Sequence, residues 1–111
     1  MRTSSEKREF PRKEFNDMVL LQIGTSGGDI FERAQVDNIS LGGICFTNIK
    51  ALKGFEHGAG SVLENNQALV YFHSSQITVF GTVMRVDCAK DRMALSVKRS
   101  TDDDLWSRLC A

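Results

Sequence analysis

Residues 67–86 read QALVYFHSSQITVFGTVMRV and give the clearest indication of the fold class. Its two halves, residues 67–72 and 77–86, are rich in β-branched and aromatic residues, which predicts two β-strands. The polar residues 73–76 between them are typical of a turn, so the two strands are expected to form a hairpin. Gly81 lies inside the longer strand and indicates a bend or bulge, which a small closing sheet requires.

Four further strand candidates lie on either side of this hairpin, and turn residues separate most of them. They are residues 18–23, 30–36, 44–47 and 93–97. Six short strands at this spacing predict an all-β fold, a six-stranded antiparallel β-barrel over residues 17–97. Residues 50–66 predict no clear element, because glycines interrupt any helix there: Gly54, Gly58 and Gly60.

The end of the chain changes from a β pattern to a helical one. Thr101 is expected to be the N-cap of a short α-helix over residues 101–110. The aspartates at 102–104 follow it, and their charge suits the positive end of a helix dipole. One face of this helix is apolar and is expected to pack on the barrel, with a partner protein as the alternative: Leu105, Trp106 and Leu109.

Charge is distributed unevenly along the chain of 111 residues, although its 14 basic and 14 acidic side chains cancel. Residues 1–14 carry five basic and three acidic side chains, and residues 101–111 carry one basic and three acidic side chains. The stretch between them carries eight of each. A hydrophobic share of 41% with one proline is typical of a soluble globular domain, expected here as a single domain over residues 1–111. The balanced body argues against binding to nucleic acid polymers.

The composition also predicts where the protein resides. The charged start of the chain is followed by no apolar stretch, so no signal peptide is expected. No run reaches the ~18 apolar residues of a membrane span, so no membrane insertion is expected. Three widely spaced cysteines, Cys45, Cys88 and Cys110, are interpreted as small apolar fillers in a reducing, cytoplasmic setting rather than as metal ligands.

Catalytic chemistry finds little support in the sequence. His57 lies in a glycine-rich stretch and His73 in a turn, and neither is near a recognisable nucleophile arrangement. The glycines of residues 54–60 match neither a phosphate-binding loop nor a dinucleotide fingerprint. The aspartates at 102–104 point in different directions on a helix, so a capping role is favoured over a metal site. The sequence therefore predicts a protein that is not an enzyme and carries no metal or cofactor.

A basic, flexible arm is expected over residues 1–14. Arg8 and Arg12 are four positions apart in it, and Pro11 between them disfavours a helix. In an extended arm the two arginines are at most about 13 Å apart, at ~3.3 Å per residue. Two guanidinium groups at this separation suit a ligand of nucleotide to dinucleotide size, because each binds phosphate or the O6/N7 edge of guanine in bidentate fashion.

Residues 37–43 are expected to break the sheet between its second and third strands, and residues 38–43 of this turn read NISLGG. Asn38 offers a donor and an acceptor, and Ser40 offers a rotatable hydroxyl. Gly43 allows the backbone to approach a ligand closely. A plain β-turn with no ligand is the alternative explanation of these residues.

Together, the RxxxR arm and the NxSxxG turn resemble the signature of PilZ domains, small bacterial barrels that bind cyclic di-GMP. Arg8 and Arg12 match the first motif, and Asn38, Ser40 and Gly43 match the second about 25 residues later. The resemblance covers nearly the whole chain, because the family also has a six-stranded antiparallel barrel and commonly a C-terminal helix.

The resemblance implies a role for each of these residues. The two arm arginines would clamp guanine and phosphate, Asn38 and Ser40 would hydrogen-bond another guanine edge, and Gly43 would keep the turn close. Lys7 precedes the arm motif, at a position where PilZ proteins vary and where the residue influences whether one ligand or a stacked pair is bound. Both stoichiometries are left open here.

The function implied by the resemblance is that of a second-messenger receptor. The arm would be mobile when empty and ordered around cyclic di-GMP, and the signal would pass to a separate, unidentified protein that controls motility, exopolysaccharide synthesis or virulence. A PilZ-like adaptor that acts through protein contacts without binding the nucleotide is the nearest alternative. A nucleic-acid-binding barrel with aromatic platforms is another, and the balanced charge of residues 15–100 argues against it.

Overall fold

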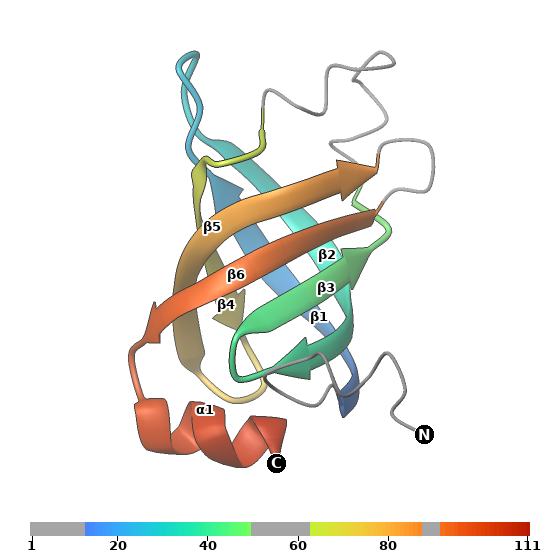
Figure 1. Cartoon of the computed structure of the whole chain (residues 1–111), viewed down its shortest axis with the longest axis vertical. Coiled ribbons are helices and arrows are strands. Elements are labelled where there is room, and N and C mark those ends of the chain that lie inside the picture. Colours follow the sequence, from blue (N-terminus) through green and yellow to red (C-terminus); the bar gives the residue numbers. More distant parts are fainter. Residues whose placement is uncertain (1–12, 50–62, 88–91) are drawn as a thin grey trace, which may run out of the picture.

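The computed structural model describes residues 13–49, 63–87 and 92–111. In this part of the chain, six strands form one closed antiparallel barrel in the order β1-β2-β3-β6-β5-β4, and one helix, α1, follows them (Figure 1). This architecture confirms the fold class expected from the sequence. The elements are β1 Lys13–Ile23, β2 Ile30–Ser40, β3 Gly43–Thr47, β4 Gln67–Phe72, β5 Ile77–Asp87, β6 Arg92–Ser100 and α1 Asp103–Cys110.

The barrel closes because β1 pairs on both of its sides. One side pairs with β2, and the other pairs with β4 from Val19↔Phe72 to Ile23↔Ala68. Closure leaves no sheet edge open to pair with another chain. Alternate residues of each strand point inward, and among them Val36, Phe46 and Phe72 are at most 1% exposed.

The β4–β5 hairpin has the bounds that the sequence predicts, apart from one extra residue at the end of β5. The turn over residues 73–76 is closed by Gln76 N donating to His73 O at 3.3 Å. The bend expected at Gly81 is a register shift between Phe80 and Gly81 on the side that faces β6. A Cβ atom at position 81 would press on the carbonyl oxygen of Ser96 and lie 2.8 Å from Leu95 Cδ2, so the barrel closes here only around a glycine.

Strand β1 is longer than predicted, since it begins at Lys13 rather than Met18. Its first half has no apolar alternation, and a register shift between Glu14 and Asp17 interrupts its pairing with β2. Phe15 anchors this half, with its ring 5.7 Å from that of Phe72. Except for its last two residues, the arm predicted over residues 1–14 lies outside the described part of the chain.

Strand β2 continues through Ser40 and β3 begins at Gly43, so the break predicted over residues 37–43 is wrong for its first four residues and its last one. The turn consists of Leu41 and Gly42 alone. Asp, Asn and Ser favour turns locally, but strand pairing with β1 and β3 on both sides outweighs this preference. Strand β6 is likewise longer than predicted, because Arg99 and Ser100 still pair with β5.

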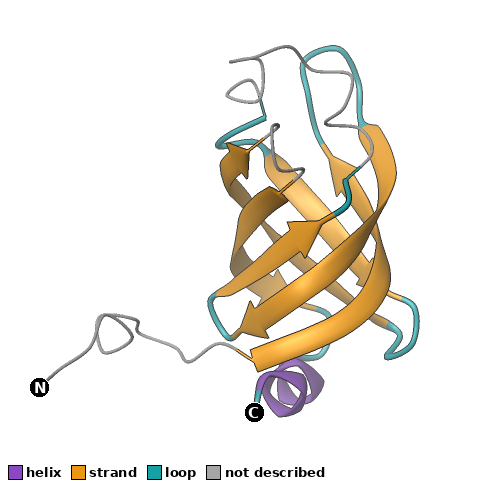
Figure 2. Ribbon diagram, turned by 90° about the vertical axis from the view of Figure 1, so that its right-hand side faces the viewer, coloured by secondary structure: helices purple, strands orange, loops and turns teal. Residues whose placement is uncertain are grey.

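Helix α1 packs against one end of the barrel, as Figure 2 shows, and this confirms the expected packing. Trp106 and Cys110 are its buried residues. The predicted N-cap, Thr101, is wrong: Asp102 is the N-cap, with its Oδ1 accepting from Leu105 N at 3.0 Å. Thr101 Oγ1 instead accepts from the backbone of Thr78 at 3.0 Å, because the chain is still paired with β5 at that point.

Candidate ligand-binding groove

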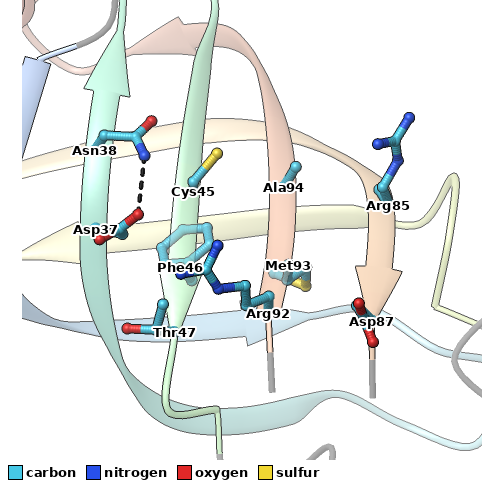
Figure 3. Close-up of a pocket in the computed structure, with 10 residues that line it drawn as sticks. All are labelled: Asp37, Asn38, Cys45, Phe46, Thr47, Arg85, Asp87, Arg92, Met93 and Ala94. Carbon is cyan, nitrogen blue, oxygen red and sulfur yellow. Dashed lines mark hydrogen bonds between the residues drawn. The ribbon is translucent and has the colours of Figure 1, made fainter. Parts of the chain in front are cut away.

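A row of four outward-facing residues crosses four strands of the barrel. Asn38 of β2 is opposite Cys45 of β3, Cys45 is opposite Ala94 of β6, and Ala94 is opposite Arg85 of β5. Figure 3 shows the four side chains at one level of the sheet, with Asn38 and Arg85 at its two ends. The row therefore has a polar side chain at each end and two small side chains between them.

Two β-bulges turn the ends of this row outward. One lies between Val36 and Asn38 where β2 pairs with β3, and the other lies between Val83 and Arg85 where β5 pairs with β6. Val36 and Val83 point into the core, both 0% exposed. In a regular strand, side chains two positions apart point to the same face, so Asn38 and Arg85 would also point inward. The extra residue in each bulge turns them outward instead.

The row forms part of the wall of a surface groove of about 290 Å³. This volume is of the size that encloses part of a nucleotide rather than a whole dinucleotide. The groove is lined by residues from the ends of four strands, namely Asp37, Asn38, Cys45, Phe46, Thr47, Arg85, Asp87, Arg92, Met93 and Ala94.

Charges of both signs line the groove. Asp37 and Asp87 contribute carboxylates, and Arg85 and Arg92 contribute guanidinium groups. Asn38 Nδ2 donates to Asp37 Oδ2 at 3.1 Å, which links the acidic and amide side chains at the β2 end of the groove (Figure 3). The mixture suits a ligand that has both hydrogen-bond donors and acceptors, and it does not form a uniformly basic face.

Ser40 and Gly43 lie beside the groove and do not line it. Ser40 is only 9% exposed at the end of β2, where it pairs with Gly43. A Cβ atom at position 43 would lie 3.2 Å from the carbonyl oxygen of Leu95, so close packing of β3 against β6 already accounts for the glycine. Of the three residues of the predicted turn motif, Asn38 alone reaches the groove.

The arm residues Lys7, Arg8 and Arg12 lie outside the described part of the chain, so their predicted role stays a prediction. The strand that follows them is described, however. Lys13 pairs with Ile39, and Glu14 pairs with Asn38. The end of the arm is therefore joined directly to a strand that runs beside the Asn38–Ser40 segment.

Sequence reasoning missed the residues on the far side of the groove: Cys45, Arg85, Arg92 and Ala94. Cys45 was interpreted as a core filler, yet it is half-buried and faces the groove, whereas Cys110 is buried as expected. Cys88 lies outside the described residues. Strand alternation marks Ala94 as outward-facing, but the two bulges and the order of the strands decide which outward residues share a groove.

No other site with evident chemistry emerges from the residues that the structure describes. Within them, no three His, Cys, Asp or Glu side chains gather to hold a metal ion. His73 is exposed, with its ring in edge contact with that of Tyr71 at 6.0 Å, whereas His57 is not among the described residues. The one described helix is too short to cross a membrane.

The fold and the groove define the chain as a small antiparallel barrel with a mixed-charge groove on its outer wall and a helix at one end. No protein-family model matches the sequence, and no curated protein matches it either. Among solved structures, the barrel is similar to the Bacillus subtilis inhibitor of motility, MotI/DgrA, with a TM-score of 0.55. The sequence identity is 22% over 93% of this chain, and the chain spans 49% of that protein.

Proposed function

We propose that this protein is a PilZ-type receptor that binds cyclic di-GMP and relays the signal to a separate protein. One observation carries the proposal: the pairing of Glu14 with Asn38 brings the strand that follows the RxxxR motif alongside the NxS segment. The two motifs are far apart in the sequence, and this pairing brings the beginning of β1, which directly follows the first motif, next to the second motif.

Covalent geometry limits how far the arm arginines are from this edge. Arg12 is bonded to Lys13, and consecutive Cα atoms are about 3.8 Å apart. Arg8 is five residues from Lys13, which corresponds to a reach of at most roughly 18 Å. This covalent limit allows both arginines to contact a ligand that also contacts Asn38.

The groove supports a nucleotide ligand by its chemistry. Guanine has acceptors at O6 and N7 and a donor at its exocyclic amine, and the groove offers guanidinium, amide and carboxylate groups. The arm would add positive charge for the two phosphates, which the groove itself does not supply in excess. The division of labour between base recognition and phosphate binding follows the resemblance to PilZ domains.

The structural neighbour supports the relay part of the proposal. MotI/DgrA is named as an inhibitor of motility. We therefore propose a regulatory output through a protein partner, with control of motility as the first process to examine. Since the present chain corresponds to about half of that neighbour, its partner need not be the same.

Isothermal titration calorimetry with cyclic di-GMP tests the proposal. We expect low-micromolar or tighter binding, and Arg8→Ala or Arg12→Ala should each weaken it at least about tenfold, since a hydrogen bond to a charged group contributes ~1.5–3 kcal/mol. Arg33→Ala is the matched control, because it removes the same charge from an exposed position of β2 that does not line the groove. If the parent protein releases no heat, the adaptor that does not bind the nucleotide is the better explanation.

A further inference from the structure

Two β-bulges shape the groove, and neither the RxxxR arm nor the NxSxxG turn explains why both are present. Two separate bulges, one on β2 and one on β5, turn Asn38 and Arg85 outward onto the same row. Each bulge interrupts regular pairing and leaves one residue of its strand without a direct partner. Two such interruptions at the two ends of one row point to a binding surface that extends from Asn38 as far as Arg85.

The hydrogen bond between Asn38 and Asp37 determines which atom Asn38 presents to a ligand. A carboxylate only accepts hydrogen bonds, so the amide nitrogen of Asn38 must be the atom that faces Asp37, at 3.1 Å. The carbonyl oxygen, Oδ1, is then left as an acceptor on the other side of the amide, as Figure 3 shows. This end of the row therefore suits a ligand edge that donates hydrogen bonds.

Arg85 supplies the opposite chemistry at the other end. It is exposed, and its guanidinium makes no hydrogen bond or ion pair with another described residue. A guanidinium group only donates hydrogen bonds, and it does so as a planar fork. This end of the row therefore suits a ligand edge that accepts two hydrogen bonds side by side.

The middle of the row is low and flat. Cys45 and Ala94, both half-buried, have two of the smallest side chains that a strand can carry there. Asn38 and Arg85 are separated by three strand spacings, roughly 14 Å between Cα atoms. With the Arg85 side chain turned over the row toward Asn38, this span would leave room for one planar base lying over the two small residues.

We propose that this row is a guanine subsite in which the base lies flat over Cys45 and Ala94, with Arg85 as a binding residue. The base would direct its N1–H and exocyclic amine toward Asn38 Oδ1 and its O6/N7 edge toward the guanidinium of Arg85. The small side chain of Ala94 would determine which ligands fit, because it leaves space for a flat base. The inference rests on the proposed cyclic di-GMP function and adds three residues outside both motifs, Arg85, Cys45 and Ala94, to the recognition by Asn38.

Adenine does not fit the same arrangement. It carries an amine donor where guanine carries the O6 acceptor, so it would direct a donor at the Arg85 donors. We therefore expect cyclic di-AMP to bind much more weakly than cyclic di-GMP. Removal of the Arg85 guanidinium should reduce this difference, because the penalty against adenine at that end is lost.

Calorimetry on the full chain tests the role of Arg85. Arg85→Ala should weaken cyclic di-GMP binding about tenfold or more and lower the preference over cyclic di-AMP by a similar factor. Arg85→Lys keeps the charge and loses the planar fork, so it should restore only part of the affinity. Arg33→Ala removes an exposed arginine of β2 that does not line the groove, and it should leave both the affinity and the preference unchanged.

The proposed position of the base over the small residues of the row is tested by a larger side chain at position 94. Ala94→Leu should abolish or strongly weaken binding while the unfolding midpoint stays close to that of the parent, because position 94 faces outward. Thr82→Leu adds the same side chain to an outward position of β5 that does not line the groove and should bind normally. Unchanged affinity in the Ala94→Leu protein would overturn the proposed position of the base.

Cys45 provides a readout that depends on contact rather than on affinity. Its thiol should react with iodoacetamide, and saturating cyclic di-GMP should slow this reaction several-fold in the parent, as measured by peptide mass spectrometry. The subsite would be overturned, and the proposed function left intact, by the following result. Cyclic di-GMP binds in a manner that depends on Arg8, but it does not slow the Cys45 reaction, and Arg85→Ala does not change the affinity. A parent protein that does not bind the nucleotide would overturn both.

Discussion

Trp106 Nε1 donates a hydrogen bond to the backbone oxygen of Leu41 at 3.3 Å, a contact between residues 65 positions apart. Leu41 belongs to the turn between Ser40 and Gly43, so this bond attaches helix α1 to the segment that carries part of the NxSxxG motif. The Trp106 ring also lies 5.6 Å from that of Phe72 in the barrel core. The helix is thus a structural part of the barrel end and a direct neighbour of the proposed binding region.

Replacement of Trp106 separates the two contributions of this residue to stability. Trp106→Ala should lower the free energy of unfolding by about 3–5 kcal/mol, because it removes a large buried side chain. Trp106→Phe keeps an aromatic ring against Phe72 and loses the donor to Leu41, so it should cost only about 1–2 kcal/mol. Urea denaturation measures both values, and equal losses in the two variants would contradict this account.

Gly81 should tolerate no side chain. Gly81→Ala places a methyl group against the Ser96 carbonyl oxygen and the Leu95 side chain, so the paired strands must move apart. The expected loss of stability is about 1–3 kcal/mol, typical of overpacking. Gly27→Ala is the control, because a Cβ atom there meets nothing within 4 Å. Thermal unfolding of the two variants should show a lower midpoint for the first alone.

The identity of the helix cap makes a third prediction. Asp102→Ala removes the acceptor for Leu105 N and should cost about 1 kcal/mol. Asp102→Asn keeps an oxygen acceptor at the same place and should stay within a few tenths of a kcal/mol of the parent. A larger loss for Asn than for Ala, measured by chemical denaturation, would argue against the side-chain cap.

Stability should fall at high pH because of Cys110. Burial raises the pKa of its thiol from 9.0 to about 11, with the positive charge of Lys13 acting in the opposite direction. The folded state therefore holds the thiol proton more tightly than the unfolded state, and this contribution is present below about pH 9 and is lost as the pH rises toward 11.

The measurement is the unfolding midpoint from pH 8 to about pH 11 in the presence of a reducing agent. The informative quantity is the difference between the parent and Cys110→Ala, because every other ionisable group is the same in the two proteins. The midpoint of the parent should fall more steeply with pH. The Cys45→Ala protein, which lacks a half-buried thiol instead, should keep the steeper slope of the parent. Parallel curves for the parent and Cys110→Ala would exclude the buried thiol as the cause.

Local pattern was sufficient for much of the fold. Residues 67–72 and 77–86 alternate and end at turn residues, and the structure places strands there with nearly the same bounds. The prediction was weakest where polar residues form strands, as in Lys13–Asp17 and Asp37–Ser40. In these segments long-range pairing provides the backbone hydrogen bonds, and the side chains give no local sign of it.

The candidate site was predicted only in part. Asn38 was identified because its amide and its spacing to Ser40 and Gly43 are visible in the sequence. Arg85 was not, since one arginine in a strand carries no local signal of a site. Its outward orientation depends on a bulge, and its relation to Asn38 depends on the order β2-β3-β6-β5 around the barrel.

The number and approximate positions of the strands, the C-terminal helix and the residue types available for binding follow from local sequence, because they depend on periodicity and turn chemistry within a few residues. The register of the closed barrel, the two bulges and the row from Asn38 to Arg85 follow from the three-dimensional fold alone. These features arise from pairing between strands far apart in the sequence, where closure and core packing select one register, and local preferences of the chain do not contain that information.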